Sequence, residues 1–495
     1  MNKSELLANL SADRDAHVAL LQRFIQAPSP NPPGETLEAA NVLAEYLASF
    51  GVLVERVCPD GDTRPNLVCD FVVGPALIER GLGGQAAGDG GDGGKGLEGG
   101  NGGEEGRTDS ALPESRPGSA PRVIMNGHLD VFPVDASRDG EWTHGGPWSG
   151  FNDGTYIHGR GGVDMKAGTA ASVIAYAYLF RHREQFARTG GKGSVALTLV
   201  SDEETGGRYG SRWLLEQGGS DSSVEADGGG RRGGDTDRDK DRWKGDVMIN
   251  AEPGGLQSIR FGEKGTLRIT FTITCKGVHG AYTHLSEGAN RIAARFVIRL
   301  VEVVESIVPD WDDEIKRQLS KEEVRRTIDE IMGPGAVDSV MKPTVNIGTI
   351  NGGIKVNMIP DRCVLEADIR LPIGLVKEVV LKKIDELMQG EFATSVSYAV
   401  QEAASNPPSH CSPNHDMVKA LENAAHTVTG RKPVAIPSLG ATDAKFWRYH
   451  GVPAYVFGVS PETMAAAVDE RVSVDEFLAV VRTHALAVWE FLGGE

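Results

Sequence analysis

The sequence predicts an α/β protein in which a doubly wound domain, built on a mainly parallel sheet, carries an inserted ferredoxin-like α/β domain. Over residues 1–258, apolar strand-like runs alternate with amphipathic helical segments, which is typical of a parallel sheet covered by helices. Residues 259–402 follow the order strand–helix–strand–strand–helix–strand, which is typical of a ferredoxin-like sandwich. The alternating pattern returns over residues 403–495, so the smaller domain interrupts the larger one.

In the first segment, hydrophobic periodicity and turn residues predict each element. The stretch PSPNPPGET at 28–36 predicts a turn and a helix start, and Gly51 ends the helix that follows. The expected helices cover residues 5–26, 37–50, 169–183 and 211–216, and the expected strands cover residues 52–57, 67–73, 122–130, 195–200 and 246–250.

Two stretches of this segment, at about 81–120 and 217–244, are rich in glycine and aspartate and hold few apolar residues. Such composition cannot bury enough apolar surface to offset the entropy of ordering. We expect both to be disordered surface insertions, and no residue in them indicates a role.

The rest of the chain is predicted in the same way. The smaller domain has expected strands over residues 267–275, 344–350, 363–371 and 394–400 and expected helices over residues 290–307, 312–332 and 375–388. The last segment has expected helices over residues 415–429, 443–449 and 473–492 and expected strands over residues 433–436 and 453–457.

The composition excludes several classes of protein. No window approaches about 18 consecutive apolar residues, so we expect no membrane span. The first thirty residues lack the apolar core of a secretory signal, which favours a cytoplasmic location. The net charge of −18 disfavours binding to nucleic acid. Five scattered cysteines without a CxxC pair argue against a disulfide framework and a thiolate zinc site.

Acidic residues gather where predicted strands end. DEETGG at 202–207 places Glu203 and Glu204 side by side after an apolar run. Neighbouring carboxylates repel each other unless a positive charge lies between them, and a cation bound by one would leave the other free to take a proton. The same pattern is also compatible with a solvated acidic turn.

Other possible ligands follow further predicted strands and loops. His128 and Asp130 are two residues apart, so their side chains face the same way. Asp164 lies in a glycine-rich loop, and Glu252 follows the strand at 246–250. One histidine with several carboxylates suits zinc, cobalt or manganese. Each position has a simpler alternative, since His-x-Asp is common in turns and Asp164 can cap the helix that follows.

The motifs GHLD, GRGGVDMKAG, DEETGG and AEPGG occur in this order at 127–130, 159–168, 202–207 and 251–255. This series resembles the dinuclear zinc amidohydrolases and metallopeptidases that include acetylornithine deacetylase, succinyl-diaminopimelate desuccinylase, aminoacylase and glutamate carboxypeptidase. The resemblance covers nearly the whole chain except the two insertions. It implies that the inserted domain is a lid through which two chains form a homodimer.

The resemblance also implies a ligand set for one or two metal ions, Zn²⁺ with Co²⁺ or Mn²⁺ as alternatives. His128 and Glu252 would bind one ion, Glu204 would bind the other, and Asp164 would bridge both. The peptide bond between Asp164 and Met165 would be cis, as is usual in the family.

Three further residues have catalytic roles by resemblance. Glu203 would be the general base, and Asp130 would orient His128. His279, in KGVHGAYTHLSEGAN, would stabilise the oxyanion across the dimer interface, although the proline usual near there is Thr283.

Two other segments would contact the substrate. Asn357 and Arg370 lie in the pair of lid strands at 348–370, and the two-pronged guanidinium of Arg370 suits a substrate carboxylate. Alternatively, Arg370 forms a surface ion pair. The stretch SLGATDAKF at 438–446 resembles a loop near the substrate and contributes Gly440, Thr442 and Asp443.

One position departs from the family pattern. The last metal ligand is normally a histidine in His-x-x-Asp-Glu, and that position is Ala466 here. A nearby histidine such as His410, His415 or His450 would replace it, the second metal site would be weak, or the enzyme would be impaired.

Three hypotheses follow. The first is metal-dependent hydrolysis of the amide bond of a small N-acyl amino acid, close to acetylornithine deacetylase. The second is a dipeptidase or carboxypeptidase with the same chemistry. The third, motivated by Ala466, is a binding or regulatory protein with weak catalysis.

Overall fold

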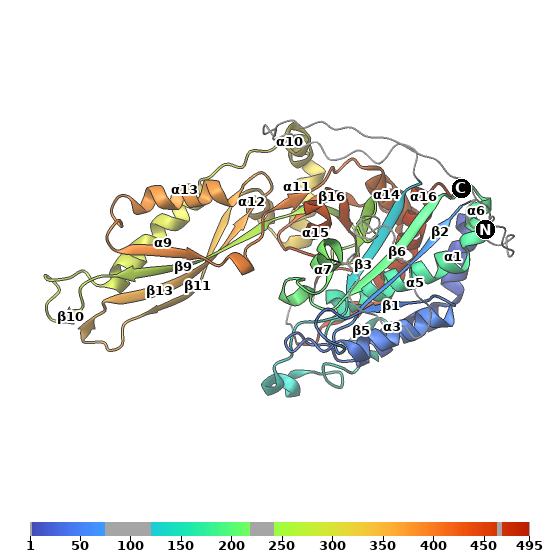
Figure 1. The fold of residues 1–495 in the computed structure, drawn as a ribbon, viewed down its shortest axis with the longest axis horizontal. Helices are drawn as coiled ribbons and strands as arrows, with labels where there is room; N and C mark the ends of the chain where they lie inside the picture. The colour runs from blue at the N-terminus through green and yellow to red at the C-terminus, as the bar shows by residue number, and fades with distance from the viewer. Residues whose placement is uncertain (1, 75–119, 218–241, 463–467, 495) are drawn as a thin grey trace, which may run out of the picture.

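The computed structural model describes residues 2–74, 120–217, 242–462 and 468–494, which form two lobes (Figure 1). The larger lobe contains both ends of the chain and a nine-stranded sheet, and the smaller lobe contains a four-stranded sheet. Both predicted insertions lie almost wholly outside the described residues, as does Ala466.

The nine-stranded sheet is mainly parallel at its centre. Its strands are β1 (Glu55–Val57), β2 (Asn66–Val73), β3 (Arg122–His128), β6 (Gly193–Val200), β7 (Val247–Asn250), β8 (Ser258–Glu263), β15 (Ser409–His410), β16 (Val434–Ser438) and β17 (Ala454–Val456). They lie in the order β1-β2-β6-β3-β7-β17-β8-β15, and β16 pairs with β8. The four central strands β6, β3, β7 and β17 are parallel, whereas β1, β2 and β15 join antiparallel to their neighbours.

Helices cover both faces of this sheet, as a doubly wound fold requires. Val123 and Met125 of β3 face one hydrophobic cluster, and Ile124 between them faces another. The first face packs mainly on α1 (Lys3–Ala12), α2 (Arg14–Gln26), α3 (Leu37–Ser49), α5 (Ala167–Arg181), α6 (Arg183–Arg188), α14 (Asp416–Thr429) and α16 (Val474–Phe491), and the second on α7 (Ser211–Glu216) and α15 (Ala444–Tyr449).

The smaller sheet has the ferredoxin-like arrangement that the sequence predicts. Its strands are β9 (Gly265–Thr274), β11 (Thr344–Gly352), β13 (Arg362–Leu371) and β14 (Val396–Val400), all antiparallel, in the order β11-β13-β9-β14. Two helices pack on one face, α9 (Ala289–Glu305) and α13 (Lys377–Met388). At the tip, β10 (Val278–His279) pairs with β12 (Met358–Ile359).

Between α9 and β11 the chain returns to the larger lobe. It forms α10 (Asp313–Ser320), α11 (Glu322–Met332) and α12 (Ala336–Met341). Leu319, Val324 and Ile328 of these helices belong to the core of the larger lobe. The boundaries predicted for the smaller domain, 259 and 402, stay predictions, since the chain crosses between the lobes more than once.

A three-stranded sheet of β4 (Phe151–Asn152), β5 (Tyr156–His158) and β18 (Arg471–Ser473) and four short helical turns complete the described fold. The turns are η1 (Ala136–Glu141), η2 (Gly162–Lys166), η3 (Glu203–Thr205) and η4 (Glu402–Ala404). No helix in the described ranges has both the length and the apolar character that a membrane span needs. All five cysteines have free thiols.

The predicted helix over residues 5–26 is wrong, because the chain breaks at Asp13 into α1 and α2. Asp13 has φ −95° and ψ 21°, outside the helical range. Each half packs on its own partner, α1 on α16 and α2 on α3 and α5. Strand β8 was not predicted from the sequence. Its charged residues Arg260 and Glu263 are both buried.

Candidate metal and catalytic site

Acidic and imidazole groups lie at one edge of the larger sheet, where the three parallel strands β3, β6 and β7 end. In the register of these strands, His128 of β3 lies beside Val200 at the end of β6, and Asn126 lies beside Asn250 at the end of β7. Glu203, Glu204 and Glu252 follow these strand ends directly. The prediction that these groups meet at the carboxyl ends of parallel strands is therefore confirmed.

His128 is at the centre of the site and is buried. Its Nδ1 lies 2.8 Å from the backbone carbonyl oxygen of Asp130, which orients the ring. Its Nε2 lies 3.3 Å from an oxygen of Asp164 and 3.4 Å from an oxygen of Glu252, without a hydrogen-bond partner in the described chain. Burial opposes protonation, but the two carboxylates raise the pKa of His128 well above its ordinary value.

The carboxylates around His128 have the geometry of a cation site. Ligand atoms of His128, Asp164 and Glu204 lie within 4.8 Å of one another, as do those of His128, Glu203 and Glu252. Burial and the charge of Asp164 raise the pKa of Glu204 to about 11 and that of Glu252 to about 7. Glu204 Oε1 is buried with no hydrogen-bond partner among the described residues. Neutral imidazole and carboxylate oxygens suit a zinc-type divalent ion, which would offset this crowding of negative charge.

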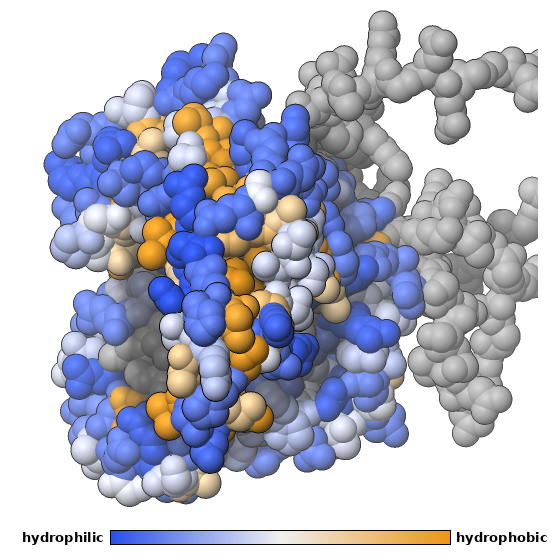
Figure 2. Space-filling view, turned by 90° about the vertical axis from the view of Figure 1, so that its left-hand side faces the viewer, coloured by the Kyte–Doolittle hydropathy of each residue, from blue (hydrophilic) through white to orange (hydrophobic). Residues whose placement is uncertain are grey.

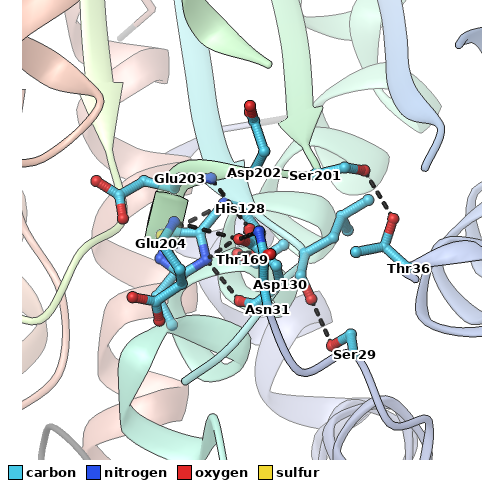
Figure 3. Close-up of polar contacts among 12 residues, drawn as sticks. Ser29, Asn31, Thr36, His128, Asp130, Thr169, Ser201, Asp202, Glu203 and Glu204 are labelled. Atoms are coloured by element: carbon cyan, nitrogen blue, oxygen red, sulfur yellow. Dashed lines mark hydrogen bonds and ion pairs between the residues drawn. The ribbon is translucent and has the colours of Figure 1, made fainter. Parts of the chain in front are cut away.

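Asp130 organises the turn that carries the two glutamates. Its carboxylate accepts hydrogen bonds from Asn31 at 2.8 Å and from the backbone amides of Glu203 and Glu204 at 3.2 Å each (Figure 3). The same carboxylate is 3.6 Å from His128 Nδ1, further than the Asp130 carbonyl oxygen. Asp130 therefore holds the imidazole mainly through its backbone, and its side chain anchors the DEETGG turn.

Asp164 is held by its backbone. The Asp164–Met165 peptide bond is cis, as predicted. Glu470, which is buried, accepts hydrogen bonds from the amides of Val163 at 2.8 Å and Asp164 at 3.3 Å and pairs with Arg160 at 2.6 Å. This role of Glu470 was not predicted from the sequence, in which the residue stood out only as part of a motif. The sequence signal for this role is the acidic pair Asp469–Glu470, which follows Ala466 and is far from Asp164 in the chain.

Three predicted residues lie away from this cluster. His279 is on β10, at the far tip of the smaller lobe, away from the larger lobe that carries the strand edge (Figure 1). Asn357 is exposed at the same tip, where its carbonyl oxygen accepts a hydrogen bond from the Gly280 amide. Arg370 lies on β13 and pairs with Asp368 at 3.0 Å, which is the alternative that sequence analysis left open. A single chain does not bring these residues to His128.

The segment at 438–446 lies closer to the site. Thr442 is buried and bonds to Glu263 through its amide and hydroxyl, at 3.2 and 3.1 Å. Asp443 is buried, accepts a hydrogen bond from Ser211 at 2.8 Å and raises the pKa of Glu203 and Glu252 by its charge. Gly440 is exposed. The substrate-contacting roles of these residues stay predictions.

The three histidines considered as replacements for the residue at 466 have other partners. His410 is 3.7 Å from Asp312, His415 caps α14 through the Met417 amide, and His450 Nδ1 is 2.8 Å from the Phe446 carbonyl oxygen. Both ligand clusters in the described ranges contain His128 as their only histidine.

Solved structures with this fold share the whole architecture at low sequence identity. An M20 family metallo-carboxypeptidase from Sulfolobus solfataricus has a TM-score of 0.66 and 18% identity, covering 96% of this chain and 99% of its own. Human carnosine dipeptidase 1 has a TM-score of 0.63 and 15% identity, covering 99% and 98%. A dinuclear metal-binding peptidase of the M20 family from Bacillus subtilis has a TM-score of 0.56 and 13% identity, covering 98% and 100%.

The family assignment comes from the sequence. Residues 124–490 match the profile of peptidase family M20/M25/M40, a span that holds all the site residues except Asn31. Together with the imidazole–carboxylate cluster, this match shows that the chain belongs to peptidase family M20/M25/M40 and is a metal-dependent hydrolase of amide or peptide bonds.

Proposed function

We propose that this protein hydrolyses the amide bond of a small N-acyl amino acid. The proposal rests on two buried atoms, His128 Nε2 and Glu204 Oε1, which have no hydrogen-bond partner in the described chain. Both lie close to the carboxylate of Asp164. Buried polar atoms are almost always paired, so two such atoms at one point indicate a ligand.

A zinc-type ion suits these donors, with cobalt or manganese as alternatives. His128, Asp164, Glu204 and Glu252 are the proposed ligands. When bound, the ion would polarise the scissile carbonyl and lower the pKa of water. The proposed number of ions is one or two, and Ala466 in place of the usual histidine favours a weaker second ion.

The proposed chemistry of the chain itself centres on Glu203. Its carboxylate lies at the same cluster and has a pKa that burial and the charge of Glu252 raise well above the ordinary value. A carboxylate of this kind is suited to take a proton from water and deliver it to the leaving nitrogen. Asn31 and Asp130 hold the turn that places it.

The substrate would be closed in by the smaller lobe of a second chain. His279 is exposed and far from the site of its own chain, so we infer that it reaches the partner's site and donates to the oxyanion. The exposed strand β11 and helix α9, with Ile350 56% and Ile298 60% exposed, are the proposed homodimer surface. Arg370 would leave Asp368 to bind the substrate carboxylate.

A dipeptide is the second candidate substrate. It has the same amide and carboxylate groups as an N-acyl amino acid, and one of the similar structures is a dipeptidase. The two differ in the free amine of the dipeptide, which the acidic site would attract.

The test is a hydrolysis screen with the metal-free protein reloaded with defined amounts of zinc or cobalt. N-acetylated amino acids, including N-acetylornithine, are compared with dipeptides of the same side chains. The proposal predicts metal-dependent release of the amino acid from the N-acetyl series, with kcat/KM at least about tenfold above that for dipeptides. The reverse order would make the protein a dipeptidase. Tight metal binding without hydrolysis in either series would favour the binding or regulatory alternative.

A further inference from the structure

Lys445 lies beside the two adjacent glutamates and has no role in the chemistry described so far. It follows Asp443 and Ala444 at the start of α15 and is only 5% exposed. Its Nζ is 3.9 Å from Glu203 Oε1. It also donates a hydrogen bond to the Thr442 carbonyl oxygen at 3.0 Å and lies 4.5 Å from the centre of the Phe446 ring.

These contacts are the kind that stabilise a buried ammonium group. A buried charge needs a counter-charge and hydrogen-bond partners, because it has lost its hydration. The Thr442 carbonyl and the Phe446 ring are a neutral acceptor and a polarisable face. The nearby carboxylates are those of Glu203, which is 3.9 Å away, and Asp443, whose pKa burial raises while the charge of Lys445 partly opposes that rise.

The ammonium makes the two glutamates different. Glu203 has Lys445 beside its carboxylate, whereas Glu204 Oε1 is buried without a hydrogen-bond partner in the described chain. Figure 3 shows the two side chains leaving the same turn in different directions. A divalent ion placed at Glu203 would stand close to an ammonium group, and like charges repel strongly where water is excluded. An ion at Glu204 avoids that repulsion.

We propose that Lys445 is a positioning residue that reserves Glu203 for proton transfer and directs the metal ion to Glu204. The proposal rests on the function proposed above, in which one of the two glutamates is a base and the other a ligand. It resolves the choice between the two geometrically possible clusters, His128–Asp164–Glu204 and His128–Glu203–Glu252, in favour of the first.

The decisive experiment measures Co²⁺ binding to the metal-free protein by calorimetry and visible absorbance. Lys445→Met, which removes the charge and keeps the length, should raise Co²⁺ affinity at least about tenfold or add a bound equivalent, because Glu203 becomes available as a ligand. The double variant Lys445→Met with Glu203→Gln should lose that gain. Lys445→Arg should behave as wild type. Lys377→Met, which removes a lysine from a surface pair with Glu402, is the matched control.

Activity is the second readout, with the best substrate of the screen. Lys445→Met should lower kcat about 10- to 100-fold with KM within about twofold, and Lys445→Arg should recover most of the loss. A rise in KM at constant kcat would overturn the proposal and make Lys445 a substrate-binding residue. Unchanged Co²⁺ binding in Lys445→Met, or a gain that survives Glu203→Gln, would overturn it too.

If Lys445→Met does not fold, two further variants test which of the two glutamates binds the metal ion. With Lys445 intact, Glu203→Gln should leave Co²⁺ affinity within about twofold and Glu204→Gln should lower it at least about tenfold. The opposite result contradicts the proposal. A wild-type protein that binds Co²⁺ but hydrolyses no substrate would refute the proposed function alone, since the binding measurements still test Lys445.

Discussion

The carboxyl edge of the larger sheet and the tip of the smaller lobe are opposite kinds of surface. At the edge, the side chains of His128, Glu203 and Glu252 are at most 12% exposed, and His128 Nε2 has no hydrogen-bond partner among the described residues. At the tip, Ile354 is 89% and Val356 100% exposed. Figure 2, which views the molecule from the end that carries the smaller lobe, shows apolar side chains gathered in a band between hydrophilic ones.

The two regions call for different binding partners. The edge of the larger sheet has an excess of negative charge that a cation would offset. The smaller lobe has exposed apolar side chains at its tip and, among the described strands, an edge strand, β11, that pairs on one side only. A second protein chain would cover both. The predictions below test whether the first region is a metal site, whether the second is a homodimer contact, and whether the two work together.

The largest effect is expected from Glu203→Gln. The amide cannot accept a proton, so kcat should fall about 10²- to 10⁴-fold. The zinc content after purification, measured by mass spectrometry of the metal, should stay at the wild-type value. Glu216→Gln, on a surface glutamate paired with Arg212, is the matched control and should change neither quantity. Equal loss of metal and activity in Glu203→Gln would show that Glu203 is a ligand.

The next largest effect is expected at the tip of the smaller lobe. His279→Ala should lower kcat about 10²- to 10³-fold, because one oxyanion donor is lost, whereas the nearby His284→Ala should have little effect. Mixing His279→Ala chains with Glu203→Gln chains should restore up to about a quarter of wild-type activity, since a mixed dimer has one intact site. Failure to recover activity after subunit exchange would place His279 in the site of its own chain.

Most of the fold could be predicted from the sequence, because strand ends and helix starts are local signals. The residues after β3, β6 and β7 were correctly expected to meet, since parallel strands bring their carboxyl ends together. The break at Asp13 could not be predicted, since the two halves of that stretch are separated by packing on different helices, which the local sequence does not show.

The supporting residues of the site were harder to predict than the ligands. Glu470 acts on Asp164 across about 300 residues of chain, and Lys445 acts on Glu203 across more than 200. Their residue types also occur on surfaces, and only tertiary packing buries them. Strand β8 was missed for the same reason, since burial of Arg260 depends on partners such as Ser438.

The third prediction tests the proposed dimer surface directly. Ile350→Arg places a charge on the exposed face of β11 and should weaken homodimer association at least about tenfold, because burying an unpaired charge is costly. Sedimentation at several concentrations measures this, and activity at low protein concentration should fall with the dimer fraction. Leu53→Arg, at a residue 92% exposed on the larger lobe, is the control. Unaltered association in Ile350→Arg would exclude this edge as the contact.

The smallest expected effect concerns the pH dependence of folding. His484 of α16 is fully buried between Ser172 and the Phe457 carbonyl oxygen, and burial lowers its pKa to about 4. The unfolded chain, with a pKa near 6.5, binds more protons between these values, so stability is full above pH 6.5 and is lost as pH falls. When the pH falls from 7 to 5.5, this histidine should lower the free energy of unfolding by about 1 kcal/mol.

His484→Gln keeps a hydrogen-bond donor for Phe457 but does not titrate, so its denaturant midpoint should change less than that of wild type over this pH range. Both proteins are compared without metal, so that loss of a bound ion does not contribute. The core of the smaller lobe consists of apolar side chains such as Phe271 and Phe296, so its unfolding should depend less on pH than that of the larger lobe. Equal acid sensitivity of His484→Gln and wild type would mean that other groups of the larger lobe, such as His17, dominate its response.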